Sequence, residues 1–180
     1  MSTVNAPYGF RPVSHPSGTI RIDSIPDGIA SAYGTAIYEN TPVKLVTSGT
    51  ITVAAAGENV LGVFCGCEFE ASGKRFIQNY WPASQAYTAG TCVAKFTRDR
   101  EIVYEVQGSG SFAQTAIGDC VDLDATTGNT TTGISTGTVG AVQGGTAQFQ
   151  VLGLAPYSDN AWGDTYTQVR VKIYEYQSVI

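Results

Sequence analysis

The side chains of this sequence that could carry out chemistry are one histidine, four cysteines and one short run of carboxylates. His15 stands between Ser14 and Pro16 in a proline-rich segment. A general base must be held rigidly beside the nucleophile that it activates, and the residues around His15 indicate no such position. We therefore expect no catalytic residue, no bound cofactor and no enzyme activity. A hydrolase with a cysteine nucleophile is the enzymatic alternative.

The cysteines lack the spacing that is typical of zinc ligands. Cys65 and Cys67 are separated by one residue, so on a strand they would share a face and could not easily form a disulfide with each other. Cys92 and Cys120 are remote in sequence, and His15 is the only imidazole. We expect four free and mostly buried thiols, with a metal site or a disulfide as the alternatives.

The densest group of carboxylates lies in residues 119–124. Asp122 and Asp124 would share one face of a strand and could contribute oxygen ligands to Ca²⁺. The calcium-loop pattern fails, however, because Thr127 stands where glycine is required and Gly133 stands where a glutamate is expected. This run is therefore interpreted as a solvated strand end, and no metal ligand is predicted.

Composition excludes several classes of partner. The formal net charge is −5, and the 10 basic residues are scattered, which argues against nucleic acid as the main ligand. No run of about 18 apolar residues is present, so we expect no membrane span. The first residues resemble no secretory signal. Only 14% of the residues are charged, below the roughly 25% of an average soluble domain, which favours a protein that packs against other proteins.

From residue 28 onward the sequence predicts an all-β body over 28–180. Short apolar and polar alternations are separated by Gly, Ser, Thr and Asn turns, as in antiparallel barrels. The expected strands cover residues 28–38, 42–46, 50–53, 60–70, 74–81, 91–96, 102–107, 119–123, 147–154 and 166–176. Two glycines inside 60–70 indicate a bulge or a barrel corner. The Thr- and Gly-rich segment 125–145 is interpreted as a hairpin with mobile turns, or as a surface loop.

Residues 1–27 differ from the rest because they contain four of the seven prolines and no sustained alternation. Proline fixes φ and drives the preceding residue toward extended geometry. We therefore predict an extended N-terminal arm that docks on a neighbouring subunit. The alternatives are a floppy tail and a strand of the chain's own barrel.

Aromatic residues near predicted turns, among them Trp162, admit two interpretations. They could be stacking platforms for a sugar, or they could be core and interface residues, in which Tyr and Trp are enriched. We favour the second interpretation. A carbohydrate-binding or tail-fibre adhesin module remains the alternative function, together with a tail or head-completion structural protein.

Two stretches resemble a known family. Residues 5–13, Asn-Ala-Pro-Tyr-Gly-Phe-Arg-Pro-Val, are similar to the starts of small structural proteins of tailed bacteriophages. Residues 41–64, from Thr-Pro-Val-Lys-Leu to Val-Leu-Gly-Val-Phe, resemble the head-decoration, or capsid cement, proteins of these phages. The resemblance implies a small β-barrel or β-tulip and a homotrimer on the outer capsid surface of the virion, made in the cytoplasm of a bacterial host. It also implies a structural role in which the protein clamps neighbouring copies of the major capsid protein.

The arm would then supply most of the partner-binding residues. We expect Tyr8 and Phe10 to bury aromatic surface and Arg11 to pair with a carboxylate, while Pro7 and Pro12 keep the segment extended. Trp162 is the expected contact outside the arm. The function predicted from the sequence is to stabilise an icosahedral phage capsid through protein–protein contacts, with neither nucleic acid nor membrane as a partner.

Overall fold

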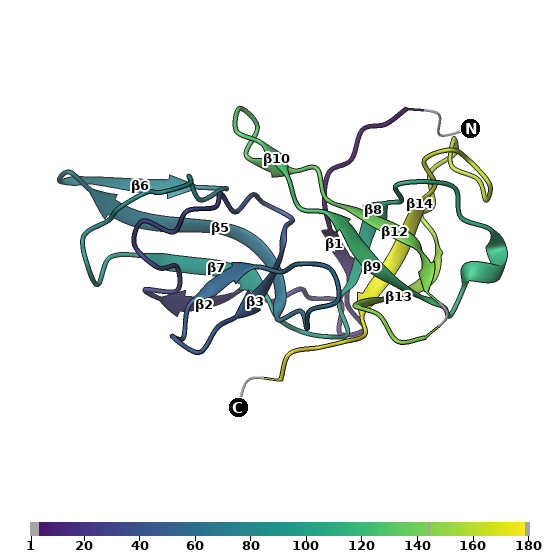
Figure 1. Ribbon diagram of the computed structural model, residues 1–180, viewed down its shortest axis with the longest axis horizontal. Helices are drawn as coiled ribbons and strands as arrows, with labels where there is room; N and C mark the ends of the chain where they lie inside the picture. The colour runs from purple at the N-terminus through teal and green to yellow at the C-terminus, as the bar shows by residue number, and fades with distance from the viewer. Residues whose placement is uncertain (1–3, 144, 179–180) are drawn as a thin grey trace.

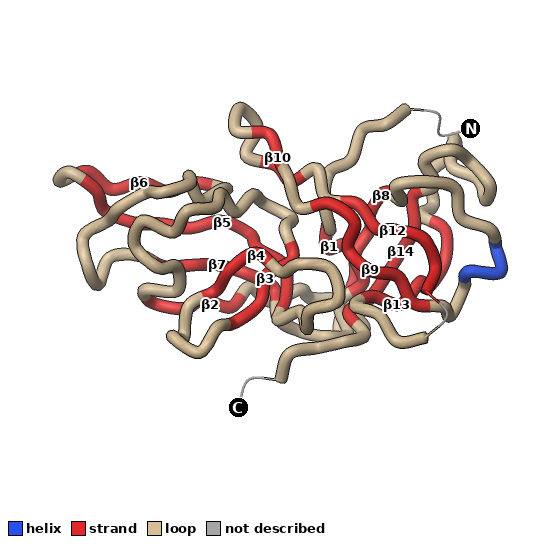
Figure 2. Tube along the Cα trace, viewed as in Figure 1, coloured by secondary structure: helices blue, strands red, loops and turns tan. Residues whose placement is uncertain are grey.

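The computed structural model describes residues 4–143 and 145–178, and the chain is all-β with antiparallel sheets, as predicted. It is elongated, with one sheet toward each end (Figure 1). Long loops and turns connect the strands (Figure 2). Within the described residues, the one helical segment is the short 3₁₀ helix η1 (Gln114–Ala116). No helix in this part of the chain is long and apolar enough to span a membrane.

The first sheet is named the β5 sheet after its longest strand. In spatial order its strands are β2 (Asp23–Pro26), β7 (Val93–Thr97), β5 (Gly62–Ala71), β3 (Pro42–Leu45) and β4 (Ile51–Val53), and β6 (Lys74–Gln78) pairs with β5 outside this path. The hairpin of β5 and β6 projects at one end of the molecule (Figure 1).

The second sheet is named the β14 sheet. In spatial order its strands are β1 (Arg11–Ser14), β8 (Val103–Gln107), β14 (Gln168–Ile173), β13 (Phe149–Leu154), β9 (Cys120–Ala125) and β12 (Thr138–Gln143). The sheet curls so that β12 returns to the end of β8, where Val139 forms an isolated bridge with Gly108. A single bridge, and not a ladder, joins these two strands.

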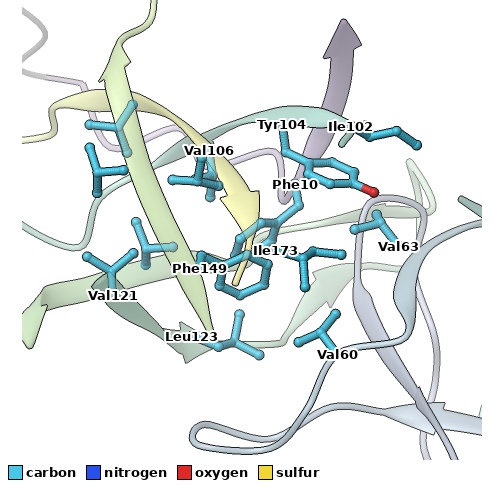
Figure 3. Close-up of a cluster of buried hydrophobic side chains, with 14 of the residues drawn as sticks. Phe10, Val60, Val63, Ile102, Tyr104, Val106, Val121, Leu123, Phe149 and Ile173 are labelled. Carbon is cyan, nitrogen blue, oxygen red and sulfur yellow. The ribbon is translucent and has the colours of Figure 1, made fainter. Parts of the chain in front are cut away.

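Each sheet has its own hydrophobic core, where we expected one barrel over residues 28–180. In the core of the β14 sheet, Phe10 stacks on Phe149 with ring centroids 4.4 Å apart (Figure 3). In the core of the β5 sheet, Trp81 is fully buried and packs edge-on against Phe69. Strand β5 contributes Val63 to the core of the β14 sheet and the neighbouring Phe64 to the core of the β5 sheet. The strand therefore joins the two halves.

The predicted bulge in β5 is present. The register with β7 shifts between Phe64 and Gly66, and Gly66 has a φ of 133°, which favours glycine. The extra residue places Phe64, Cys67 and Phe69 in the same core. Cys65 is left out of that core, so the expectation that Cys65 and Cys67 share a face is wrong because the bulge interrupts the alternation.

Most of the predicted strands are confirmed, with one informative difference. Val169, Val171 and Ile173 on β14 are buried, as their alternation indicated. The Thr- and Gly-rich segment does form a hairpin, β10 (Gly128–Asn129) with β11 (Ile134–Ser135), and then strand β12. Residues 28–38 form turns, with only an isolated bridge at residue 37, because their glycines and small side chains interrupt the pattern.

Residues 4–27 contribute one strand to each sheet, which differs from the predicted separate arm. Strand β1 pairs with β8, and β2 pairs with β7. Both strands lie at sheet edges, where Pro12 and Pro26 are tolerated because an edge residue needs no donor on its outer side. The structure therefore matches the alternative in which the N-terminal segment forms strands of the chain's own body, and not a docking arm or a floppy tail.

Candidate interaction site on the outer face of the β14 sheet

A row of charged side chains crosses three strands of the β14 sheet. Arg11 on β1 is in register with Glu105 on β8, and Glu105 is in register with Arg170 on β14. Because side chains alternate along a strand, burial of Tyr104 and Val106 in the core directs Glu105 to the outer face. The same alternation places Arg170 on that face, between buried Val169 and Val171.

Glu105 is the centre of this row. It accepts a 2.8 Å hydrogen bond from Arg11 Nη2, and bonds of 3.1 and 3.0 Å from Nε and Nη2 of Arg170. The hydroxyl of Tyr157 also donates to its carboxylate. Burial of Glu105 would by itself raise the pKa of this carboxyl, but the donors from Tyr157, Arg11 and Arg170 outweigh it and hold the pKa below its usual value. Glu105 therefore remains a carboxylate at neutral pH.

The N-terminal segment lies along this face and is held by glutamine side chains. The hydroxyl of Tyr8 donates a 3.0 Å bond to Oε1 of Gln168, and the Arg11 guanidinium lies 5.0 Å from the centre of the Tyr8 ring. Gln107 accepts a 3.1 Å bond from the backbone N–H of Ala6 and donates a 2.8 Å bond to Asn5 Oδ1. The segment is thus docked on its own sheet.

The predicted partner-binding residues fall into three places. Pro7, Tyr8, Arg11 and Pro12 lie together on or beside this outer face, with Arg11 the most exposed of the four. Phe10 points to the opposite side and is fully buried, so it cannot anchor a neighbour as predicted.

Trp162 lies apart from this group. Its half-buried ring packs against the core of the β14 sheet from the loop before β14. The pairing of Arg11 with a carboxylate, which we predicted across an interface, occurs within the chain.

His15 has a better-defined environment than the sequence indicated. Its Nδ1 lies 2.7 Å from Ser17 Oγ, and its Nε2 lies 3.1 Å from an oxygen of Asp99 in the turn between β7 and β8. The backbone N–H of Ser17 donates a 3.1 Å bond to the same Nδ1. The imidazole therefore closes a local turn and ties it to Asp99. No local pattern could have indicated Asp99, because 84 positions of sequence separate it from His15.

Another serine, Ser135, lies in a sequence that matches the nucleophile-elbow pattern of hydrolases. Residues 133–137 read Gly-Ile-Ser-Thr-Gly, a pattern that in hydrolases places a serine on a sharp turn between strand and helix. Here Ser135 lies in β11 and is fully buried. Its Oγ accepts a 3.0 Å bond from the N–H of Gly137 and donates to the carbonyl of Thr127. This hydroxyl is buried and bonded within the hairpin region.

The cysteines are free thiols, as predicted. Burial raises the pKa of Cys67 to about 12 and that of Cys92 to about 11. At neutral pH both are protonated, and a thiol in that state is a poor nucleophile. In the part of the chain that the structure describes, no three His, Cys, Asp or Glu side chains gather as metal ligands would.

Several large apolar side chains are exposed at positions that sequence reasoning did not single out. Ile77 on β6 is 71% exposed and Val4 in the N-terminal segment is 69% exposed, the highest values among the large apolar side chains described. β6 pairs only with β5 among the described strands, so its other edge can accept hydrogen bonds from a further strand. A smaller group on the β14 side comprises Ile117, Val142, Leu152 and Tyr174.

Comparisons of the chain with protein-family models, with curated proteins and with solved structures give no match.

Proposed function

We propose that this chain is a structural protein of a bacteriophage virion, which decorates the outer surface of an icosahedral capsid as a homotrimer and stabilises it by bridging neighbouring major capsid subunits. The proposal combines the resemblance of residues 5–13 and 41–64 with the contact surfaces described above. The proposed function involves no catalytic step, cofactor or metal.

The observation that carries the proposal is the placement of two exposed apolar contact points far apart on one elongated body. Ile77 lies on the projecting β5–β6 hairpin, and the N-terminal segment with Val4 begins on the side of the β14 sheet (Figure 1). A protein that bridges a seam needs two separated contacts, one for each neighbour. A single binding pocket would require neither.

The unpaired edge of β6 offers a specific mode of contact. A strand from a neighbouring protein could add to it through main-chain hydrogen bonds, with the Ile77 side chain burying apolar area beside them. Arg75 and Lys95 on this side are already paired with Glu68, at 2.5 and 3.2 Å. Arg75 therefore brings a compensated charge to this edge, whereas Lys74 on the same strand forms no ion pair with any described residue.

Binding to isolated capsids that lack a decoration protein tests this proposal. The purified full chain is expected to co-sediment with such capsids, and Ile77→Asp is expected to weaken the binding by about tenfold or more, because a carboxylate replaces a buried apolar contact. Ile117→Asp makes the same change at a 49% exposed isoleucine in the η1 loop and is expected to bind as the unchanged chain does.

Equal binding by both variants would contradict the role of the β6 edge. Failure of the unchanged chain to bind any capsid, together with glycan binding that is lost in Trp162→Ala, would replace the proposal with the adhesin alternative. Deletion of residues 1–13 is not a clean test of the N-terminal contact, since it removes the buried Phe10 and most of β1.

A further inference from the structure

A pocket lies where the segment before β2, the turn between β7 and β8, and the tail after β14 meet. It has a volume of about 360 Å³ and is lined by Arg21, Asp23, Arg98, Asp99, Arg100 and Tyr176. A second hollow of about 230 Å³ adjoins it, shares Arg21 and Asp99, and reaches His15 and Ser17. The pocket thus collects three arginines in a chain whose net charge is negative.

The two carboxylates of this pocket are already engaged. Asp23 pairs with Nε of Arg98 at 3.3 Å, and Asp99 lies 3.1 Å from Nε2 of His15. Asp99 also accepts a 2.9 Å bond from the backbone N–H of Glu101. Arg21 and Arg100 form no ion pair with any residue that the structure describes.

The two arginines that form no ion pair with a described residue, Arg21 and Arg100, both line this pocket. Ten residues of the chain are lysine or arginine, and most of them pair with a carboxylate. Within the described residues the ones that form no ion pair are Arg21, Lys74, Arg100 and Lys172. Both arginines of this set line the same hollow, whereas neither lysine does.

The side chains present match a compact oxyanion. A guanidinium presents planar pairs of N–H donors whose spacing fits the oxygens of phosphate or carboxylate. Tyr176 adds a hydroxyl on the same wall, and burial raises the pKa of this phenol, so the hydroxyl stays protonated and can donate. The volume exceeds what one such anion fills, so water can complete its shell.

We propose that this pocket binds a compact, doubly charged oxyanion of the phosphate class through Arg21 and Arg100. Arg21 precedes β2 of the β5 sheet, and Arg100 precedes β8 of the β14 sheet. A bound anion therefore links the two halves of the molecule and stabilises the folded chain by mass action. This inference does not depend on the proposed capsid function.

Thermal unfolding and calorimetric titration of the full chain with inorganic phosphate test the inference, with sodium chloride at matched ionic strength as the reference. The unchanged chain is expected to give a saturable rise in Tm and a measurable Kd. The double variant Arg21→Gln/Arg100→Gln is expected to raise the Kd by about tenfold or more, because both charge-assisted contacts are lost. Acetate, which carries one charge, is expected to bind more weakly than phosphate.

A matched control separates a built site from general charge effects. Lys74→Gln/Lys172→Gln removes the same net charge at the two other unpaired basic residues and is expected to leave the Kd unchanged. Each single arginine variant is measured as well, so that a folding defect in the double variant cannot hide the result. Equal loss of binding in both double variants, or a phosphate response no larger than that of chloride, would overturn the inference.

Discussion

Glu105 is only 3% exposed, yet three donors from three different parts of the chain keep its carboxylate charged. Two of these donors, Arg11 and Arg170, remain partly exposed, with 48% and 38% of their side chains accessible. The arrangement therefore avoids burying uncompensated charge and still fixes the position of β1 against β8 and β14. The hydrogen bond between Glu105 and Arg11 is thus one reason why the N-terminal segment lies on this sheet.

Replacing this carboxylate should destabilise the fold in a pH-dependent way. Because the folded-state pKa of Glu105 is lowered, its contribution is present above the unfolded value of roughly 4.3 and is lost as the pH falls through the folded value. We expect Glu105→Gln to lower the free energy of unfolding by about 1–3 kcal/mol at pH 7. The difference from the unchanged chain should shrink below pH ~4. Urea unfolding between pH 7 and pH 3 measures it.

The control for this experiment is Glu101→Gln, which alters an exposed glutamate in the turn before β8. It is expected to change stability by less than about 0.5 kcal/mol. A Glu105→Gln chain with unchanged stability at pH 7 would mean that the row of charges does not hold β1 in place.

At the residue scale, sequence reasoning singled out Tyr8 and Arg11 for contacts with a neighbour, and the structure shows both bonded within the chain. Tyr8 and Arg11 were predictable as interacting residues because an aromatic ring and a guanidinium in a proline-rich stretch need partners. The residue type of Phe10 did not distinguish it from Tyr8 as a contact residue. Its stacking on Phe149 in the structure shows that it faces inward. The contact of His15 with Asp99 depends on how the β7–β8 turn meets the N-terminal segment, which no spacing records.

Among the elements, β5 depends most on glycine. A Cβ at Gly62 would lie 1.7 Å from the carbonyl oxygen of Thr97 on β7, where backbone cannot easily move. We expect Gly62→Ala to reduce the free energy of unfolding by about 3 kcal/mol or more. Gly153→Ala on β13, where a Cβ would meet no atom within 4 Å, should stay within about 0.5 kcal/mol.

Chemical unfolding of the two glycine variants side by side makes this comparison. If Gly62→Ala and Gly153→Ala proved equally stable, the close approach of β5 and β7 would not exist in solution.

Long alternating segments were predictable as elements, and short edge strands were not. β14 shows a clean alternation of buried and partly exposed residues, so both its existence and its inner face follow from the sequence. β1 and β2 contain four residues each and include prolines, so their local pattern indicates extended chain without indicating a partner. Their pairing with β8 and β7 is decided by the edges that those strands leave open.

At the scale of the whole molecule, the two sheets are joined by buried polar contacts as well as by β5. Gln148 is fully buried, and its Nε2 donates bonds of 2.8 and 2.7 Å to the carbonyls of Ala55 and Glu58. Near the C-terminus, Gln177 exchanges two hydrogen bonds with the backbone of Leu45. Such contacts between distant segments are invisible to periodicity, so the sequence pattern predicted strands without showing how they divide between two sheets.

The proposed role requires that this two-sheet body associate with copies of itself. The outer edge of β6 and the exposed Val4 are surfaces that a monomer would leave in water at a cost, whereas an assembly would cover them. Self-association is therefore the property on which the account depends most.

Light scattering of the purified full chain over a range of concentrations tests that property most directly. The account predicts a species with three times the mass of one chain. A species with the mass of one chain at every concentration would contradict it.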